Sequence, residues 1–320
     1  MKTKLLLLTT LLSLAIPAMA QLNDTYVIPV SANVRGGFAT QWMTRVSLFN
    51  PQLDYKLRIS VTFLPTGGAK GIEELVDLPP NALAYSNNIL QDLFKVSSGS
   101  GALLVAAFPE DNPGVPNDVL SRSFLVNSET YNNNPGGTYG QTIPGTWTGL
   151  MDYQTDGISS IAHGIRNSGN WRTNIGAVNL GRCAVNLLVN VYDADGNTVR
   201  KDLPFTIPPL GHMQDRLPIA ISNGTLEFFV DDPCTADDNL YAVVFPYTST
   251  IDQQSGDPSY QSPTLLASPS SIFAKTAMKI DPHNLGTKVD VDYARKVRAD
   301  ADRRGVASLR KTENGWNITE

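Results

Sequence analysis

The chain is poor in the residues from which many catalytic and metal centres are built. It has 320 residues but only two cysteines and three histidines. His163, His212 and His283 lie far apart in the sequence, and no two have the spacing of a metal-binding pair. The nucleophile-elbow, zinc-helix and phosphate-loop motifs are also missing. We therefore do not expect an enzyme, although a hydrolase site made of carboxylates that meet only on folding stays open.

Clustered positive charge is missing from the body of the chain. The net charge is -5 overall, but residues 275–320 carry +3 and the first twenty residues carry +2, which leaves about -10 for residues 21–274. Nucleic-acid binding draws on clustered lysine and arginine. The composition therefore predicts no nucleic-acid partner.

Long apolar runs are missing after the N-terminus. Lys2 and Lys4 precede an apolar run from Leu5 to Ile16, and an A-x-A site ends at Ala20. This order is typical of a secretory signal peptide, and the run is too short to span a bilayer. We expect residues 1–20 to be removed, the mature chain to have no transmembrane segment, and the protein to be periplasmic or extracellular.

A long internal repeat is the most informative feature that is present. Two short motifs recur 129 residues later in one register, which indicates duplicated domains rather than a solenoid. The first copy of these motifs consists of Trp42, Thr44, Val46, Asn50 and Leu78-Pro79-Pro80, and the second copy of Trp171, Thr173, Ile175, Asn179 and Ile207-Pro208-Pro209. Recurrence in both copies favours a structural role for the two tryptophans over sugar stacking.

Alternating polar and apolar residues and frequent turns predict an all-β fold. We expect two tandem antiparallel β-sandwich domains at 21–150 and 151–274, with about seven strands in each copy. Residues 144–157 are predicted to link them. The charged C-terminal extension, 275–320, is predicted either to form one helix over Val289–Arg304 or to stay disordered.

Both cysteines, Cys183 and Cys234, fall in the second repeat. An exported protein reaches an oxidising compartment, so we expect them to form a disulfide; two separate buried thiols are the alternative. The chain-entropy relation gives such a bridge a stabilisation of roughly 4 kcal/mol.

Two sets of residues are candidates for ligand binding. Tyr131, Tyr139 and Trp147 are the aromatics available for a carbohydrate site, and the polar segments 109–118 and 128–138 are candidate contact loops. Asp193, Asp195 and Asn197 resemble the start of a calcium loop, but the downstream glutamate is missing. A hairpin turn with Gly196 at positive φ is the alternative interpretation, and no other cofactor is expected.

The motif around Trp42-Met43-Thr44-Arg45, repeated as Trp171-Arg172-Thr173-Asn174, resembles a pattern in poorly characterised exported bacterial proteins. The resemblance implies tandem immunoglobulin-like modules and brings no catalytic residues with it. The function that we expect is therefore non-enzymatic binding or scaffolding of an unidentified protein or glycan partner outside the cytoplasm. Carbohydrate binding and carboxylate-based hydrolysis are the alternatives.

Overall fold

The computed structural model describes residues 22–36, 40–134, 137–150, 158–231, 243–267, 287–312 and 315–319. These residues form an all-β fold with several sheets, as the sequence predicts. The expected signal peptide lies outside them. No helix in the described ranges is long and apolar enough to cross a membrane.

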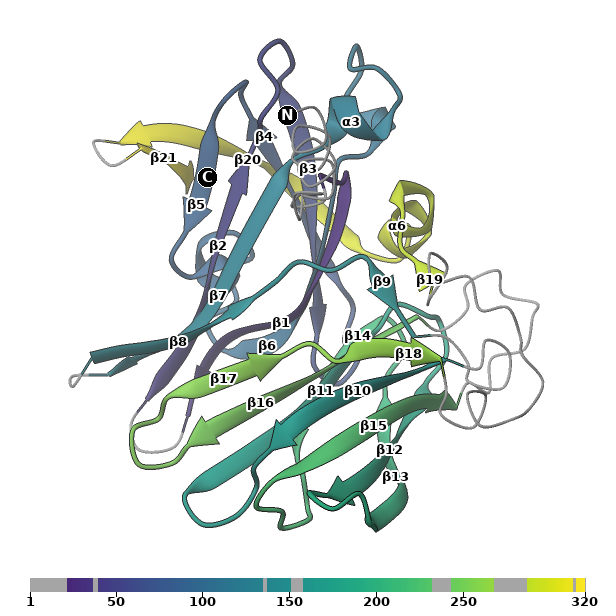
Figure 1. Ribbon diagram of the computed structural model, residues 1–320. Helices are drawn as coiled ribbons and strands as arrows, with labels where there is room; N and C mark the ends of the chain where they lie inside the picture. Colours follow the sequence, from purple (N-terminus) through teal and green to yellow (C-terminus); the bar gives the residue numbers. More distant parts are fainter. Residues whose placement is uncertain are drawn as a thin grey trace, which may run out of the picture.

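The described chain falls into three parts (Figure 1). The first half, residues 22–150, contains β1 (Thr25–Arg35), β2 (Gln41–Phe49), β3 (Leu57–Pro65), β4 (Ile72–Leu78), β5 (Leu83–Ser86), α2 (Ile89–Asp92), β6 (Gly99–Ala106), η1 (Pro109–Asp111), α3 (Val119–Arg122), β7 (Leu125–Asn134), β8 (Gly137–Ile143) and β9 (Thr148–Gly149). The second half, residues 158–267, contains β10 (Ile158–Ile165), β11 (Trp171–Asn179), β12 (Val185–Asp193), β13 (Thr198–Ile207), β14 (Gly211–Arg216), β15 (Gly224–Asp231), β16 (Val244–Asp252), β17 (Pro258–Gln261) and β18 (Thr264–Ala267). The C-terminal segment contains β19 (Thr287–Lys288), α6 (Val291–Arg298), β20 (Asp302–Thr312) and β21 (Gly315–Thr319).

The order of strands repeats between the halves. In the second half, one sheet has the order β13-β12-β15-β10-β18 and the other has the order β14-β11-β16-β17. The first half contains the matching orders β4-β3-β6-β1 and β5-β2-β7-β8. There the long strand β1 pairs with both β6 and β2, so the two groups become parts of one ten-stranded sheet.

The repeat extends to single hydrogen bonds. Thr44 and Thr173 are fully buried, and each Oγ1 lies 2.8 Å from the Oγ1 of a second threonine, Thr130 and Thr250 respectively. Each bond joins a repeated strand, β2 or β11, to its neighbour β7 or β16. Such equivalence at buried polar positions is what a duplicated unit predicts.

Asn50 and Asn179 close the ends of these strands in the same way. Asn50 donates through Nδ2 to the carbonyl of Pro79 at 3.1 Å, and Asn179 donates to that of Pro208 at 3.2 Å. Both asparagines are fully buried. The Pro-Pro motif and the asparagine are therefore conserved between the copies because they form one corner together.

The repeated tryptophans lie at the start of their strands and are half-buried. The guanidinium of Arg166 lies over the ring of Trp171 with its Cζ 3.7 Å from the ring centroid, a cation–π contact. Trp42 and Trp171 thus occupy the strand ends rather than the centre of either core.

Apolar side chains form one core in each half and a third between them. In the second half, residues from both sheets, such as Leu187 and Ala177, share one cluster. The third cluster combines Val27 and Leu104 of the first half, Phe245 of the second half and Val297 of α6. The halves and the C-terminal segment therefore pack against one another through buried apolar surface.

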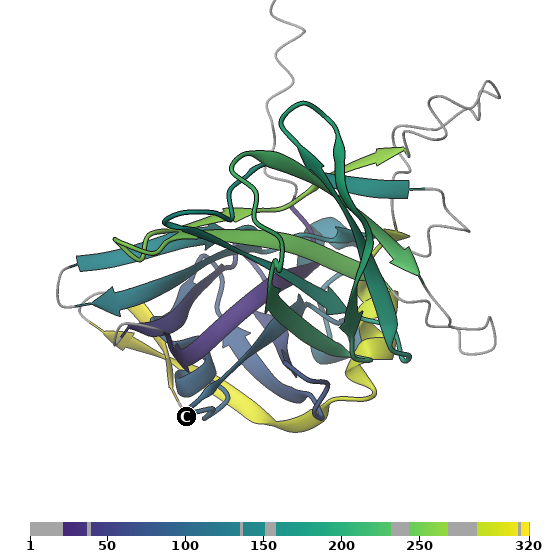
Figure 2. The same ribbon diagram turned by 90° about the horizontal axis from the view of Figure 1, so that it is seen from below.

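The C-terminal segment is folded onto the first half (Figures 1 and 2). Strand β20 pairs in parallel with β4, with Ala307 opposite Val76, and Ile318 of β21 reaches the first-half core. The predicted helix over 289–304 was too long, because α6 ends at Arg298 and a strand begins at Asp302. Pairing with the open edge of β4 overrides the helical pattern of this stretch.

Two other local predictions need correction. Residues 128–134 are not an irregular loop, because they lie in strand β7, which forms a hairpin with β8. Residues 148–149 of the expected linker pair with β19 rather than connect two separate bodies. In each case a partner strand distant in the sequence supplies the order that the local composition did not indicate.

Candidate functional site: the seam groove

A groove of about 660 Å³ lies between the halves, and we call it the seam groove. Residues Thr66 and Gly67 of the first half line one side. The remaining lining comes from the end of β13, from β14 and from residues just after each strand: Leu203, Pro204, Phe205, Thr206, Pro208, His212, Met213, Gln214, Asp215, Arg216 and Pro218. Both β13 and β14 are outermost strands in their sheets, so the groove lies at the side of the second half where its two sheets end.

Glycines allow the first half to approach this side closely. Gly67 and Gly68 have φ of +84° and +75°, a backbone region in which glycine carries no steric cost. A Cβ on Gly68 would lie 2.6 Å from Pro208. The turn after β3 can therefore lie directly against the Pro-Pro corner of the second half, where the amide of Gly67 donates to the carbonyl of His212 at 3.1 Å.

His212 forms the polar floor of the groove and is fully buried. Its Nδ1 lies 2.7 Å from Oγ1 of Thr66, and its Nε2 lies 2.8 Å from the hydroxyl of Tyr247. Because that hydroxyl donates to Gln214 Oε1 at 2.7 Å, it accepts from His212. The proton of the imidazole is therefore on Nε2, and Nδ1 accepts from Thr66.

Burial sets the charge state of this network. Desolvation lowers the pKa of His212 from 6.5 to about 3, and it raises the pKa of Tyr247 well above its ordinary value. Both groups stay neutral near pH 7. The network therefore joins the halves through neutral hydrogen bonds and does not supply an acid–base pair to the groove.

The walls of the groove combine apolar and polar surface. Phe205 and Met213 are buried members of the second-half core. Thr206, Gln214 and Asp215 are exposed along the same two strands. A mixed lining of this kind, on a concave surface, is typical of sites that bind a ligand.

The three aromatic residues that the sequence proposed for carbohydrate are not brought together. Tyr131 is buried, donates its hydroxyl to the carbonyl of Asn87 at 2.9 Å, and lies beneath Arg45. Tyr131 is opposite Gly140 in the β7–β8 hairpin, so Tyr139 projects from the other face of that sheet. Trp147 contacts the C-terminal segment, with Lys288 Nζ 5.0 Å from its ring centroid.

The proposed calcium loop is a hairpin turn. Asp193 Oδ1 accepts hydrogen bonds from the amides of Asp195 and Asn197 at 3.0 and 2.8 Å, and Gly196 has φ +82°. A hydrogen bond from the side chain of Asn197 contributes most to lowering the pKa of the Asp193 carboxyl. Its oxygens therefore stabilise the turn. Within the described ranges, no group of three or more His, Cys, Asp or Glu side chains is placed to hold a metal ion.

The predicted disulfide includes Cys234, which lies outside the described residues, so the Cys183–Cys234 bridge stays a prediction. His283 lies outside them as well. His163 is exposed on β10, which belongs to a different sheet from β14, the strand that carries His212.

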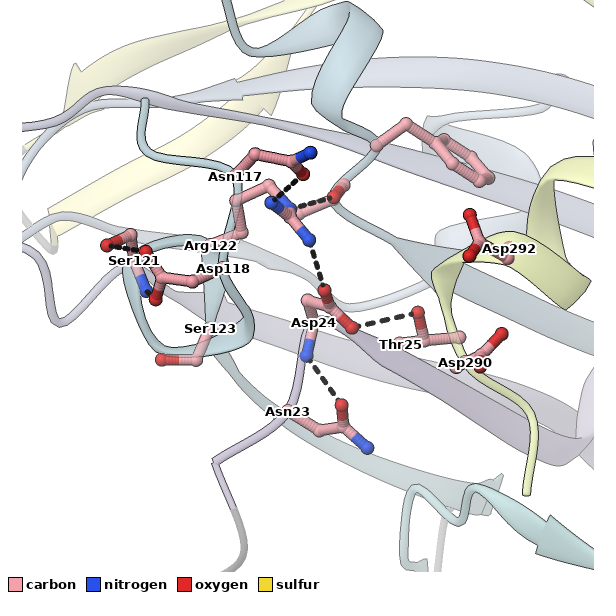
Figure 3. Close-up of polar contacts among 12 residues, drawn as sticks. Asn23, Asp24, Thr25, Asn117, Asp118, Ser121, Arg122, Ser123, Asp290 and Asp292 are labelled. Atoms are coloured by element: carbon pink, nitrogen blue, oxygen red, sulfur yellow. Dashed lines mark hydrogen bonds and ion pairs between the residues drawn. The ribbon is translucent and has the colours of Figure 1, made fainter. Parts of the chain in front are cut away.

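Two buried carboxylates elsewhere, Asp24 and Glu73, are held in ion pairs with arginines. A third, Glu227, accepts hydrogen bonds from Ser159, Asn190 and Tyr192. The pair of Asp24 is drawn in Figure 3. Asp24 and Arg122 are almost completely buried and meet at 2.9 Å, with Thr25 donating to the same carboxylate. Burial raises the pKa of Asp24, and the hydrogen bond from Arg122 opposes that rise. Asp290 and Asp292 lie at the start of α6 in the same view, where Asp290 caps the helix by accepting from the amide of Tyr293.

Replacing Gly176 of β11 with alanine should disturb the wall behind the groove. A Cβ at this position would lie 2.0 Å from the ring of Tyr247, which is fully buried and holds His212. We expect Gly176→Ala to lower the free energy of unfolding by about 1–3 kcal/mol, the usual cost of overpacking. Urea unfolding measures this change, and Gly305→Ala, whose Cβ would meet only Glu74 Oε2 at 3.8 Å, is the matched control. Equal stability of the two variants would contradict this packing.

Comparison with known proteins gives no family. No family model and no curated protein matches the chain. A solved structure of β-glucuronidase from Bacteroides uniformis aligns over 71% of this chain and 26% of that one, with 9% identity and a TM-score of 0.14. This chain therefore spans about a quarter of that structure's length, and the likeness is too low to inform fold or function.

Sequence reasoning did not find the seam groove. Its parts were visible separately, as the glycine-rich turn at 65–68 and the repeated Pro-Pro corner. What could not be seen was that the turn of one copy packs against the corner of the other, because the repeat describes each half by itself.

Proposed function

We propose that this chain is an exported, non-enzymatic binding protein made of two immunoglobulin-like β-sandwich units in tandem, with the seam groove as its contact surface. The groove itself carries the proposal. Its volume of about 660 Å³ is in the range of ligand sites, and such sites occur preferentially where two units meet.

The repeated strand order supports the tandem sandwich arrangement. Each half contains the same two groups of four strands, and in the second half residues from both groups share one core. Two layers around a common core are the defining feature of a sandwich. The link through β1 in the first half would then be a strand that passes between the layers.

Binding is favoured over catalysis by the state of the ionisable groups. His212 is neutral and enclosed beneath the groove. Two of the buried carboxylates, Asp24 and Glu73, each lie within 3 Å of an arginine nitrogen, at 2.9 and 2.8 Å. The third, Glu227, accepts hydrogen bonds from Ser159, Asn190 and Tyr192. Groups fixed in this way stabilise the fold and are poorly placed to transfer protons to a substrate.

A photo-crosslinking amino acid at Thr206 tests the proposal. Thr206 is exposed on β13 within the groove, and Thr198 is exposed on the same strand but does not line it. Each variant is expressed with its N-terminal segment and irradiated in the intact cell. We expect a discrete adduct in the exported fraction from position 206 and not from position 198, together with a mature N-terminus at Gln21. Adducts from neither position, or equally from both, would contradict the groove as a contact surface.

A further inference from the structure

We propose that the seam groove binds an extended β-strand segment of a partner polypeptide, which lies beside β14. This inference rests on the proposed function and identifies the class of partner. The first half supports it, because there the C-terminal segment of this chain occupies the position that the groove leaves open in the second half.

In the first half, the C-terminal hairpin covers the outermost strands. Strand β20 pairs in parallel with β4 from Asp302–Ile72 to Ala307–Val76. Strand β21 lies along β5, and Ile318 contributes to the first-half core. The space beside β4 and β5 is thus occupied by an extended segment that comes from more than 200 residues away in the sequence.

The two spaces are equivalent by register. In the first half Val46 is opposite Ser86 and Leu48 is opposite Ala84. Adding 129 to each number gives the pairs that join β11 to β14, which are Ile175–Asp215 and Ala177–Met213. Strands β5 and β14 therefore occupy the same place in their units, and so do β4 and β13 at the ends of the matching sheets.

The second half shows this space as the seam groove. Within the described part of the chain, no strand pairs with the outer edge of β13, and β14 is met there only by a single parallel bridge from Thr66 to His212. Phe205 and Met213 are larger than their counterparts Val76 and Ala84, yet a hollow of about 660 Å³ remains. Such uncovered outer strands are templates for strand addition.

The added segment would pair with β14 rather than with β13. Pro204 removes one amide from β13, and Asp202 has φ +49°. The edge of β13 is therefore interrupted at the positions that correspond to those at which β4 pairs with β20 in the first half. The edge of β14 continues beyond the Thr66–His212 bridge through the exposed residues Gln214–Arg216. A segment in the groove would extend that bridge in parallel and place alternate apolar side chains against Phe205 and Met213.

A random peptide library tests this inference on the full-length protein. Phage-displayed peptides of about ten residues, the length of a long strand, are selected on the wild type. Binding is then measured to Thr206→Arg, which places a charge in the groove, and to Thr198→Arg on the same strand outside it. We expect selected sequences to alternate apolar and polar residues, and Thr206→Arg to weaken their binding by about tenfold or more with no change for Thr198→Arg.

Hydrogen exchange separates strand addition from other binding. The amides of Met213 and Asp215 face β11, whereas those of Gln214 and Arg216 face the open edge. A paired segment should slow the exchange of the Gln214 and Arg216 amides, whereas contacts made only through side chains would leave these two amides unprotected. Failure to select groove-dependent peptides, or selected peptides without protection of β14, would overturn the inference. If crosslinking from Thr206 identified a glycan, the groove would keep its binding role and the strand partner would be wrong.

Discussion

Lowering the pH from about 7.5 to about 5 should reduce the free energy of unfolding by about 2 kcal/mol through His212 alone. The pKa of this histidine is about 3 in the fold and near 6.5 when unfolded, so at pH 5 the unfolded chain binds a proton that the folded chain does not. Stability is therefore complete above the unfolded pKa and falls as the pH drops from about 6.5 toward about 3.

The partners of His212 explain why the fold does not compensate for protonation. Thr66 and Tyr247 are uncharged, and Tyr247 in turn donates to the neutral Gln214. Among the described residues, the ring nitrogens of His212 meet Thr66 and Tyr247 and no carboxylate, so an imidazolium would be unpaired there, at the contact between the halves. Acidification should therefore weaken that contact before it affects the core of either half.

Urea unfolding at several pH values measures the effect, with His212→Gln as the control. The variant should be less stable at neutral pH and should lose most of the slope between about pH 7 and pH 5. If His212→Gln does not fold, the imidazole signals of the wild-type protein provide a second measurement. An imidazole at position 212 that titrates near its ordinary value would show that the site is not closed in this way.

Replacing Arg298 with methionine should cost about 3–5 kcal/mol, the usual penalty for removing one partner of a buried ion pair. The guanidinium of Arg298 lies 2.8 Å from Glu73 and 2.5 Å from Asp111, with both carboxylates at least nine-tenths buried. It also lies over the ring of Phe108 with its Cζ 4.5 Å from the centroid. Both carboxylates would lose this partner, and within the described part of the chain Glu73 would keep the hydrogen bond from Ser60 alone.

The same variant should release the C-terminal segment from the first half. Arg298 is the last residue of α6, and strand β20 begins four residues later. We therefore expect limited proteolysis to cut the C-terminal segment earlier in Arg298→Met than in the wild type. Arg295→Met is the matched control, because its pair with Glu110 is 43% exposed on both sides and such pairs contribute about 1 kcal/mol or less. Similar losses for both variants would show that burial does not matter here.

The sequence predicted the features that repeat or depend on local pattern. The alternation of polar and apolar residues predicts the all-β class, and the 129-residue repeat predicts the equivalence of Thr44 with Thr173. The hairpin at Asp193 follows from its turn residues. These succeed because one strand and its turn are encoded within a few neighbouring residues.

Contacts between the copies could not be predicted in the same way. His212 lies after a Pro-Pro turn and has the same sequence signal as an exposed histidine, but Thr66 of the other copy encloses it. The charge pattern of residues 289–304 favours a helix, and only the open edge of β4 makes a strand of its second part. The sequence proposes Tyr131 as a binding residue, but β2 and β8 flank it in the fold and it is buried. The local sequence does not specify that pairing.

The parallel pairing of β20 with β4 also concerns the order of events during synthesis. Strand β4 is complete after 78 residues, but its outer partner begins at residue 302, after the whole second half has been made. Loop closure over such a distance slows folding, and until β20 is made the outer edge of β4 can pair with other chains. The half that is synthesised first is thus completed last, and a chain that ended between the second half and residue 302 would lack a strand from the sheet of its first half.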